Sequence, residues 1–126
     1  MVDRSLLGCR ILVVEDEYVL ADELRTELTE AGGIVLGPVA TVEDALDLIR
    51  AEPHIDGAIL DVNLRGESAY PAADLLAERN VPFVFATGYD ASAIPSRFTE
   101  IVRCEKPVSI RKIAQALGRI VGSDKP

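Results

Sequence analysis

Several polar side chains come directly after strongly apolar segments, and their types together suggest one kind of chemistry. They are Glu15 and Asp16 after "ILVV", Asp61 after "AIL", Thr87 at the end of "VFAT", and Lys106 after "RCE". Carboxylates that lie close together raise each other's pKa unless positive charge is placed among them. A lysine supplies one such charge, and a hard divalent cation such as Mg²⁺ would supply the rest. Such a set fits transfer of a phosphoryl group to a carboxylate, which acts as the nucleophile while the metal, the lysine and the hydroxyl bind the phosphoryl oxygens.

This chemistry requires that the apolar segments lie side by side, and their pattern predicts that they are strands. Runs of apolar and β-branched residues predict five strands, at residues 9–14, 34–40, 56–61, 81–87 and 100–105. Gly37-Pro38 limits the second strand to a sheet edge or a strand end, because proline cannot donate a ladder hydrogen bond.

Segments with helical periodicity alternate with these strands. Residues 17–31 predict a helix that ends before Gly32-Gly33, and residues 71–78 predict another with Pro71 near its first turn. A helix after Thr41, with Asp44 in a capping arrangement, and a last helix are also expected. Pro95 keeps any helix in residues 90–98 short or distorted. The expected inner faces are Leu20, Leu24 and Leu28; Val42, Leu46 and Ile49; and Ile110, Ile113, Leu117 and Ile120.

Five β-α units predict an α/β fold of three layers, a doubly wound parallel sheet with helices on both faces. In such sheets ligands bind beyond the carboxyl ends of the strands. We therefore expect the acids, the threonine and the lysine to converge on one small region at that edge.

Composition narrows the class of protein. A length of 126 residues fits one domain, and a net charge of −8 argues against a nucleic-acid binder, which needs a basic surface. We expect no membrane span, because no run of about 18 apolar residues occurs, and no secretory signal at the N-terminus. Cys9 and Cys104 are too few for a disulfide framework, so we expect two packing residues and a cytoplasmic location.

Four motifs carry a resemblance to a known family. "ILVVEDE", "AILDVNL", "FATGY" and "EKP" resemble, in order and spacing, the receiver domains of bacterial two-component response regulators (CheY-like), over about residues 9–121. "FATGY", with "AYPAADLL" upstream, is similar to the FATGUY subgroup of stand-alone receivers, found chiefly in alphaproteobacteria and linked to general stress and related phosphorelays. The resemblance implies a flavodoxin-like (βα)5 fold with strand order 2-1-3-4-5.

The resemblance also implies a role for each residue that matches a motif. Asp61 would be the phosphoacceptor, Thr87 the switch hydroxyl, and Lys106 the cation that binds the phosphoryl group. The implied Mg²⁺ ligands are Asp16, Asp61, the backbone carbonyl of Asn63, and Glu15 acting through water. Pro107 follows the lysine where the family often has a cis bond.

Two positions depart from the family pattern. Glu15 stands where Asp is commoner, and it reaches about one methylene farther. Arg103, on the fifth strand, stands where typical receivers carry an aromatic switch residue. Tyr89, two residues after the threonine, would either replace that switch or merely pack.

The expected function is that of a single-domain response regulator, not an enzyme. It would accept a phosphoryl group from a histidine kinase, of the HWE or HisKA2 type, or from a phosphotransfer protein, and signal by binding a downstream protein or by onward transfer. We expect a monomer or weak dimer, with residues 1–8 as an N-terminal extension, 9–121 as the receiver, 122–126 as a C-terminal tail, and no effector domain after it.

Other interpretations of the same residues stay open. One is a pseudo-receiver, a scaffold that binds proteins and is never phosphorylated. An aspartyl phosphatase is disfavoured, because position 63 is Asn rather than a second carboxylate. Asp61 could also simply form a turn, and His54, after Pro53, is expected to be an exposed turn residue.

Overall fold

The core of the structure, a computed structural model, is one parallel β-sheet of five strands. The structure describes residues 6–88, 94–106, 109, 112–113 and 115–117. Along the sheet the order is β2-β1-β3-β6-β7, and each adjacent pair is parallel. Counted over these five strands, this is the predicted order 2-1-3-4-5. The strands are β1 (Arg10–Val14), β2 (Ile34–Val39), β3 (Gly57–Asp61), β6 (Phe83–Thr87) and β7 (Arg103–Glu105).

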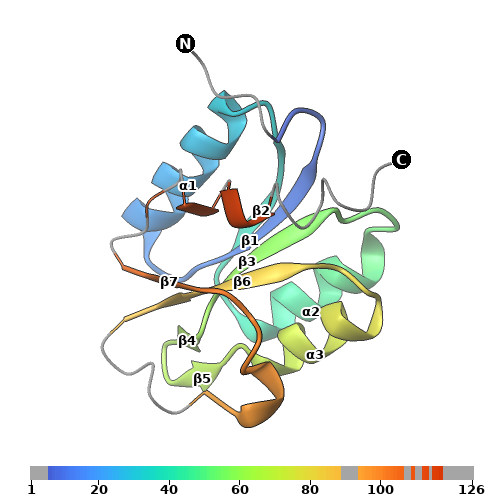
Figure 1. Cartoon of the computed structure of the whole chain (residues 1–126), viewed down its shortest axis with the longest axis vertical. Coiled ribbons are helices and arrows are strands. Elements are labelled where there is room, and N and C mark those ends of the chain that lie inside the picture. The colour runs from blue at the N-terminus through green and yellow to red at the C-terminus, as the bar shows by residue number, and fades with distance from the viewer. Residues whose placement is uncertain (1–5, 89–93, 107–108, 110–111, 114, 118–126) are drawn as a thin grey trace.

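Helices cover both faces of this sheet, as predicted (Figure 1). Helix α1 (Tyr18–Glu30) lies on one face, while α2 (Val42–Ala51) and α3 (Tyr70–Glu78) lie together on the other. Residues 112–113 and 115–117 are helical and pack on the same face as α1. The three-layer, flavodoxin-like architecture is therefore confirmed.

Alternate residues of each strand point to opposite faces and build two separate cores. Leu12 and Val14 of β1 join the core under α2 and α3, whereas Ile11 and Val13 join the core under α1. Both sides of the central strands are thus buried, which explains why β3 is apolar throughout until its last residue, Asp61.

Helix ends follow the sequence signals. Thr41 caps α2, since its side-chain oxygen accepts a 3.0 Å hydrogen bond from the amide of Asp44. Pro71 lies in the first turn of α3. Gly32, with a positive φ of 92°, allows the chain to turn directly after α1.

The predicted inner faces are mostly correct. Leu24, Leu28, Val42 and Ile49, together with Ile113 and Leu117, are buried, while Ile110 and Ile120 lie outside the described residues. Leu20 and Leu46 are only half-buried, and the small residues Ala21 and Ala45 take the buried positions beside them. Alanine lets the helix backbone approach the sheet closely, which moves the larger leucines to the edge of the contact.

Two strand starts differ from prediction by two or three residues. The fourth and fifth main strands begin at Phe83 and Arg103 rather than at residues 81 and 100. Before β7 the chain still turns, because the amide of Ile101 donates a 3.0 Å hydrogen bond to the carbonyl of Phe98. The described part of the segment between β6 and β7 holds a 3-10 helix, η2 (Ser96–Phe98), which agrees with the short or distorted helix expected there.

Strand β2 lies at an edge of the sheet, one of the two positions that Gly37-Pro38 allowed. Its pairing with β1 shifts register between Leu12 and Val14.

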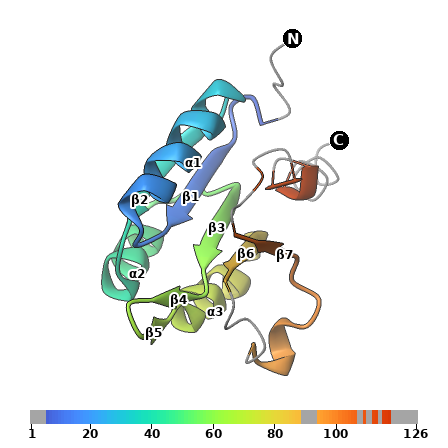
Figure 2. The same ribbon diagram turned by 90° about the vertical axis from the view of Figure 1, so that its left-hand side faces the viewer.

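A hairpin that the sequence did not predict follows β3. Strands β4 (Asn63–Leu64) and β5 (Glu67–Ser68) pair antiparallel and lie beyond the carboxyl end of the sheet (Figure 2). Two-residue strands carry too few apolar residues to produce a periodic signal.

The described part of the N-terminal segment packs on the sheet. Leu6 is fully buried in the α1-side core, and the amide of Gly8 donates a 2.9 Å hydrogen bond to the carbonyl of Gly32. Cys9 and Cys104 are buried thiols, as expected. Among the described residues, no helix has the length and apolar character needed to cross a membrane.

Candidate functional site

Strand register brings the predicted site residues to one edge of the sheet. Val14 pairs with Leu60, so Glu15 and Asp16 emerge beside Asp61. Asp61 pairs with Ala86, the residue before Thr87, and Thr87 pairs with Glu105, the residue before Lys106. Parallel strands end at the same edge, and four of them therefore contribute to the site.

Lys106 is the central cation of this edge. Its Nζ donates a 2.8 Å hydrogen bond to Asp61 Oδ2 and lies 3.3 Å from Glu15 Oε1 and 3.8 Å from Glu17 Oε1. Its own backbone amide donates a 2.8 Å hydrogen bond to the carbonyl of Thr87, which fixes the end of β7 against β6. Burial would lower the pKa of Lys106, but the hydrogen bond and attraction to Asp61 raise it overall, so the ammonium stays charged.

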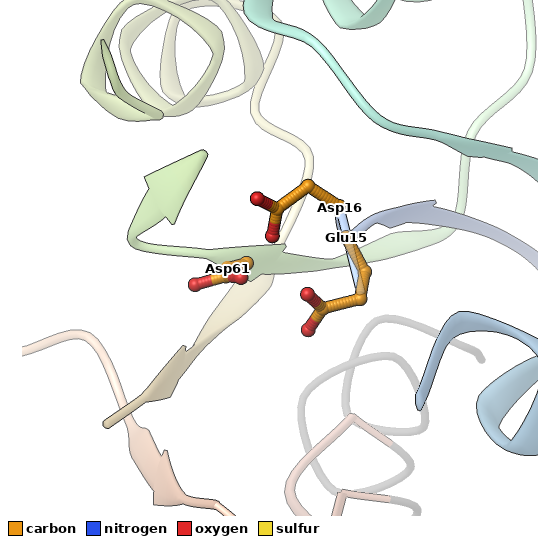
Figure 3. A group of neighbouring side chains, drawn as sticks. All are labelled: Glu15, Asp16 and Asp61. Atoms are coloured by element: carbon orange, nitrogen blue, oxygen red, sulfur yellow. The ribbon is translucent and has the colours of Figure 1, made fainter. Parts of the chain in front are cut away.

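Three carboxylates gather around one small space. Glu15, Asp16 and Asp61 each offer an oxygen, and these oxygens all lie within 4.8 Å of one another. Figure 3 shows the three side chains together where β1 and β3 end. Only 1% of the Glu15 side chain and 5% of the Asp61 side chain are exposed, so water screens their charges poorly.

Glu15 has the most deeply buried side chain of the three acids. Its Oε2 accepts a 3.0 Å hydrogen bond from the amide of Glu17, but its buried Oε1 accepts none from the described residues. The 3.3 Å approach of Lys106 Nζ to Oε1 is an ion pair without hydrogen-bond geometry. Burial, and secondarily the nearby Asp61 carboxylate, raise the pKa of Glu15 to about 8.

The donor set fits a hard divalent cation. Carboxylate oxygens are the ligands that such cations prefer, and three are available from two neighbouring strands. A cation in this space would contact Glu15 Oε1, which accepts no hydrogen bond from the described residues, and would offset both the burial and the Asp61 charge that raise the pKa of Glu15.

The β4–β5 hairpin closes one side of the site. The amide of Asn63 donates a 3.1 Å hydrogen bond to Asp61 Oδ1, and Asn63 Oδ1 accepts a 2.9 Å hydrogen bond from the amide of Gly66. Arg65, in the turn, brings its Nε to 3.7 Å from Asp16 Oδ2. Sequence reasoning missed Arg65, although a cation four residues after Asp61 was a visible signal.

The remaining predicted residues are placed as follows. Thr87 is buried, with 2% of its surface exposed, at the end of β6. Arg103 is exposed at the start of β7, where it pairs with Phe85 of β6. Tyr89 and Pro107, considered as a substitute switch and a cis bond, lie outside the described residues. His54 is exposed, as expected, and its Nε2 lies 2.7 Å from Asp56 Oδ1.

A doubly wound parallel sheet with clustered acids, a threonine and a lysine at its carboxyl edge is the arrangement of a response regulator receiver domain. No family model matches the chain. It is 30% identical over 118 residues to an uncharacterized response regulatory protein of Yersinia pestis, and 30% identical over 84 residues to the transcriptional regulatory protein YvrH of Bacillus subtilis. These alignments cover 88% and 66% of the chain, but only 48% and 35% of the two relatives, so the chain spans at most about half of their length.

Solved structures give fuller matches. SdrG from Sphingomonas melonis is 41% identical, with a TM-score of 0.78 over 93% of this chain and 98% of that one. A BeF3-activated conformation of SdrG is 38% identical, with a TM-score of 0.73 over 96% of this chain and 99% of that one. A receiver protein of Sinorhizobium medicae, 22% identical with a TM-score of 0.78 over 94% and 98% of the two chains, shares the fold. The chain belongs to the response regulator receiver family.

Proposed function

We propose that the chain is a phosphorylatable receiver in which Asp61 accepts a phosphoryl group from a histidine kinase or a phosphotransfer protein, in a Mg²⁺-dependent reaction. The observation that carries this proposal is the position of Asp61 itself. Its Oδ2 lies 2.8 Å from Lys106 Nζ, and the side chain belongs to a group of three carboxylates whose oxygens lie within 4.8 Å of one another.

In the proposed reaction an Asp61 carboxylate oxygen attacks the phosphorus of the donor's phosphohistidine. The new O–P bond forms as the N–P bond breaks, and the electron pair of that bond stays on the imidazole nitrogen. Lys106 offsets the charge of the incoming phosphoryl group, which a buried carboxylate could not approach unaided.

The proposed ligands of Mg²⁺ are Asp16, Asp61 and the backbone carbonyl of Asn63, with Glu15 acting through water. Bound there, the ion would offset the negative charge of the phosphoryl oxygens. The Glu15 oxygen that accepts no hydrogen bond from the described residues and the crowding of three acids support this assignment.

The proposed output is a change of surface rather than turnover of a substrate. Thr87 and Lys106 would move toward the phosphoryl group and shift a pre-existing equilibrium of the 88–106 segment. A downstream protein would read that surface, or another phosphotransfer protein would take the phosphoryl group onward. Tyr89 is the proposed replacement for the aromatic residue absent at Arg103.

We further propose membership of the FATGUY subgroup, a cytoplasmic location and a kinase of the HWE or HisKA2 type. The motif "FATGY", with "AYPAADLL" upstream, supports the subgroup. The proposed receiver unit is residues 9–121, with an N-terminal extension anchored by the buried Leu6. A phosphotransfer profile against all histidine kinases of the source organism, with Asp61→Ala as the control, would identify the donor.

Beryllofluoride, which mimics a phosphoryl group, gives the test of this function. Because one SdrG structure is of a BeF3-activated conformation, we expect the same ligand with Mg²⁺ to shift the NMR resonances around Asp61, Thr87 and Lys106 together. Asp61→Asn should show no such response. If the wild-type chain is equally unresponsive, it is a pseudo-receiver scaffold and the proposed function is wrong.

A further inference from the structure

The turn of the β4–β5 hairpin holds an arginine in an unfavourable backbone conformation beside the acidic cluster. Leu64 pairs with Glu67, so Arg65 and Gly66 form a two-residue turn, with positive φ values of 52° and 89°. This turn type favours Asn or Asp followed by Gly, and a long side chain at its first position carries a backbone strain. The turn thus presents Arg65 where an asparagine would fit the backbone better.

The guanidinium of Arg65 faces one particular acid of the site. Its Nε lies 3.7 Å from Asp16 Oδ2, with 77% of the Arg65 side chain exposed and 14% of the Asp16 side chain exposed. Lys106 pairs with Asp61 and Glu15. Arg65 and Lys106 therefore divide the three clustered carboxylates between them, and the chain supplies its own counter-charge at the position of a proposed metal ligand.

From this geometry we propose that Arg65 tunes the affinity of the acidic cluster for divalent cations by competing for Asp16. The proposal rests on the proposed function, since it uses the same magnesium site. A cation bound to the Asp16 carboxylate would stand close to the Arg65 guanidinium, whose Nε lies 3.7 Å from Oδ2 of that carboxylate. The two positive charges repel, so Arg65 must leave Asp16 when the cation binds. Its exposed position on the hairpin turn lets it rotate into solvent.

Solvent screens the ion pair between Arg65 and Asp16, which limits its effect on cation affinity. An ion pair as exposed as this one is weak, so its removal should strengthen cation binding by about twofold to fivefold rather than by orders of magnitude. Arg65 is accordingly a tuning residue and not a ligand.

The test is a titration with Mg²⁺ alone, followed by the NMR shifts of amides around Asp16. Arg65→Gln should bind Mg²⁺ about twofold to fivefold more tightly than the wild-type protein. Arg65→Asn should show the same gain in Mg²⁺ affinity, although asparagine suits the backbone of this turn better than arginine does. Agreement between the two variants would assign the gain to the lost charge rather than to a loosened hairpin. Arg50→Gln is the matched control, because Arg50 is a similarly exposed arginine that lies 3.9 Å from the acid Asp47, near the end of α2. Its affinity should equal that of the wild-type protein.

The outcomes separate this proposal from the function on which it rests. If both Arg65 variants bind Mg²⁺ no more tightly than Arg50→Gln, the tuning role is wrong and the phosphoacceptor role of Asp61 is untouched. If the wild-type protein binds no Mg²⁺ at all, both the tuning role and the magnesium site are wrong.

Discussion

Lys106 Nζ lies 2.8 Å from Asp61 Oδ2, although 45 residues separate the two in the chain. The contact spans the end of β6 and depends on the register of three strands, since the Lys106 amide is also bonded to the carbonyl of Thr87. The cation thus lies beside the proposed acceptor carboxylate before any phosphoryl group arrives.

Removal of this cation should destabilise the protein. Lys106→Met leaves the buried Asp61 carboxylate without its hydrogen-bonded cation, and we expect the free energy of unfolding to fall by about 1–3 kcal/mol at neutral pH without metal. Denaturant unfolding followed by circular dichroism measures this change. Lys112→Met, at an exposed position, is the control and should behave like the wild-type protein. Equal stabilities of the two variants would contradict the assigned role of the ion pair.

Glu15 should make stability depend on pH. Its pKa is raised from 4.5 to about 8 by burial and by Asp61, so the folded protein holds a proton that the unfolded chain has already released. The resulting stabilisation is complete below about pH 4.5 and is lost as the pH rises toward about 8. Unfolding free energies measured across this range, with a chelator present, should decline as pH rises. Glu15→Gln should flatten that decline. If the unfolding free energy of this variant falls with pH as steeply as that of the wild-type protein, another group causes the pH dependence.

Magnesium should stabilise the folded protein through Asp16. A ligand that binds only the folded state at 100 times its dissociation constant adds about 2.7 kcal/mol. We expect Mg²⁺ to raise the melting temperature of the wild-type protein, and Asp16→Asn to lose most of that increase. Glu17→Gln is the matched control, because Glu17 is the next acid but is 64% exposed and lies outside the carboxylate group. A loss of the magnesium effect in Glu17→Gln alone would place the ion elsewhere.

Substitution of Thr87 should leave phosphorylation of Asp61 intact but weaken the conformational response that follows it. Thr87→Ala removes a hydroxyl from the buried end of β6 but leaves Asp61 and Lys106 in place, so it should still take up a phosphoryl group. The NMR response of the described residues 94–106 should be reduced in this variant and restored in Thr87→Ser, which keeps the hydroxyl. A full response in Thr87→Ala would show that the hydroxyl is not the switch.

The sequence was sufficient to predict the sheet and most of the site. Strands β1, β3 and β6 are buried on both faces, so each is a continuous apolar run that ends visibly at Glu15, Asp61 or Thr87. The carboxyl edge of a parallel sheet, with the strand order that the family resemblance implies, then brings these residues together.

The features that were not predicted depend on very short strands or on contacts that only the folded chain makes. The β4–β5 hairpin is fixed by single hydrogen bonds from the amides of Asn63 and Gly66, and two-residue strands have no periodicity to detect. The pair of Arg65 with Asp16 arises from the turn that this hairpin makes. The late start of β7 likewise follows from a local turn at Phe98 and Ile101.

The most direct test is to incubate the protein with Mg²⁺ and a small-molecule phosphodonor and to locate the added phosphoryl group by mass spectrometry. We predict one phosphoryl group on Asp61 that hydroxylamine removes, as expected of an acyl phosphate, absent from Asp61→Asn and from samples without divalent cation, and retained in Asp47→Asn, a change at an exposed acid on α2. Undiminished uptake by Asp61→Asn, or no uptake by the wild-type protein, would contradict the account.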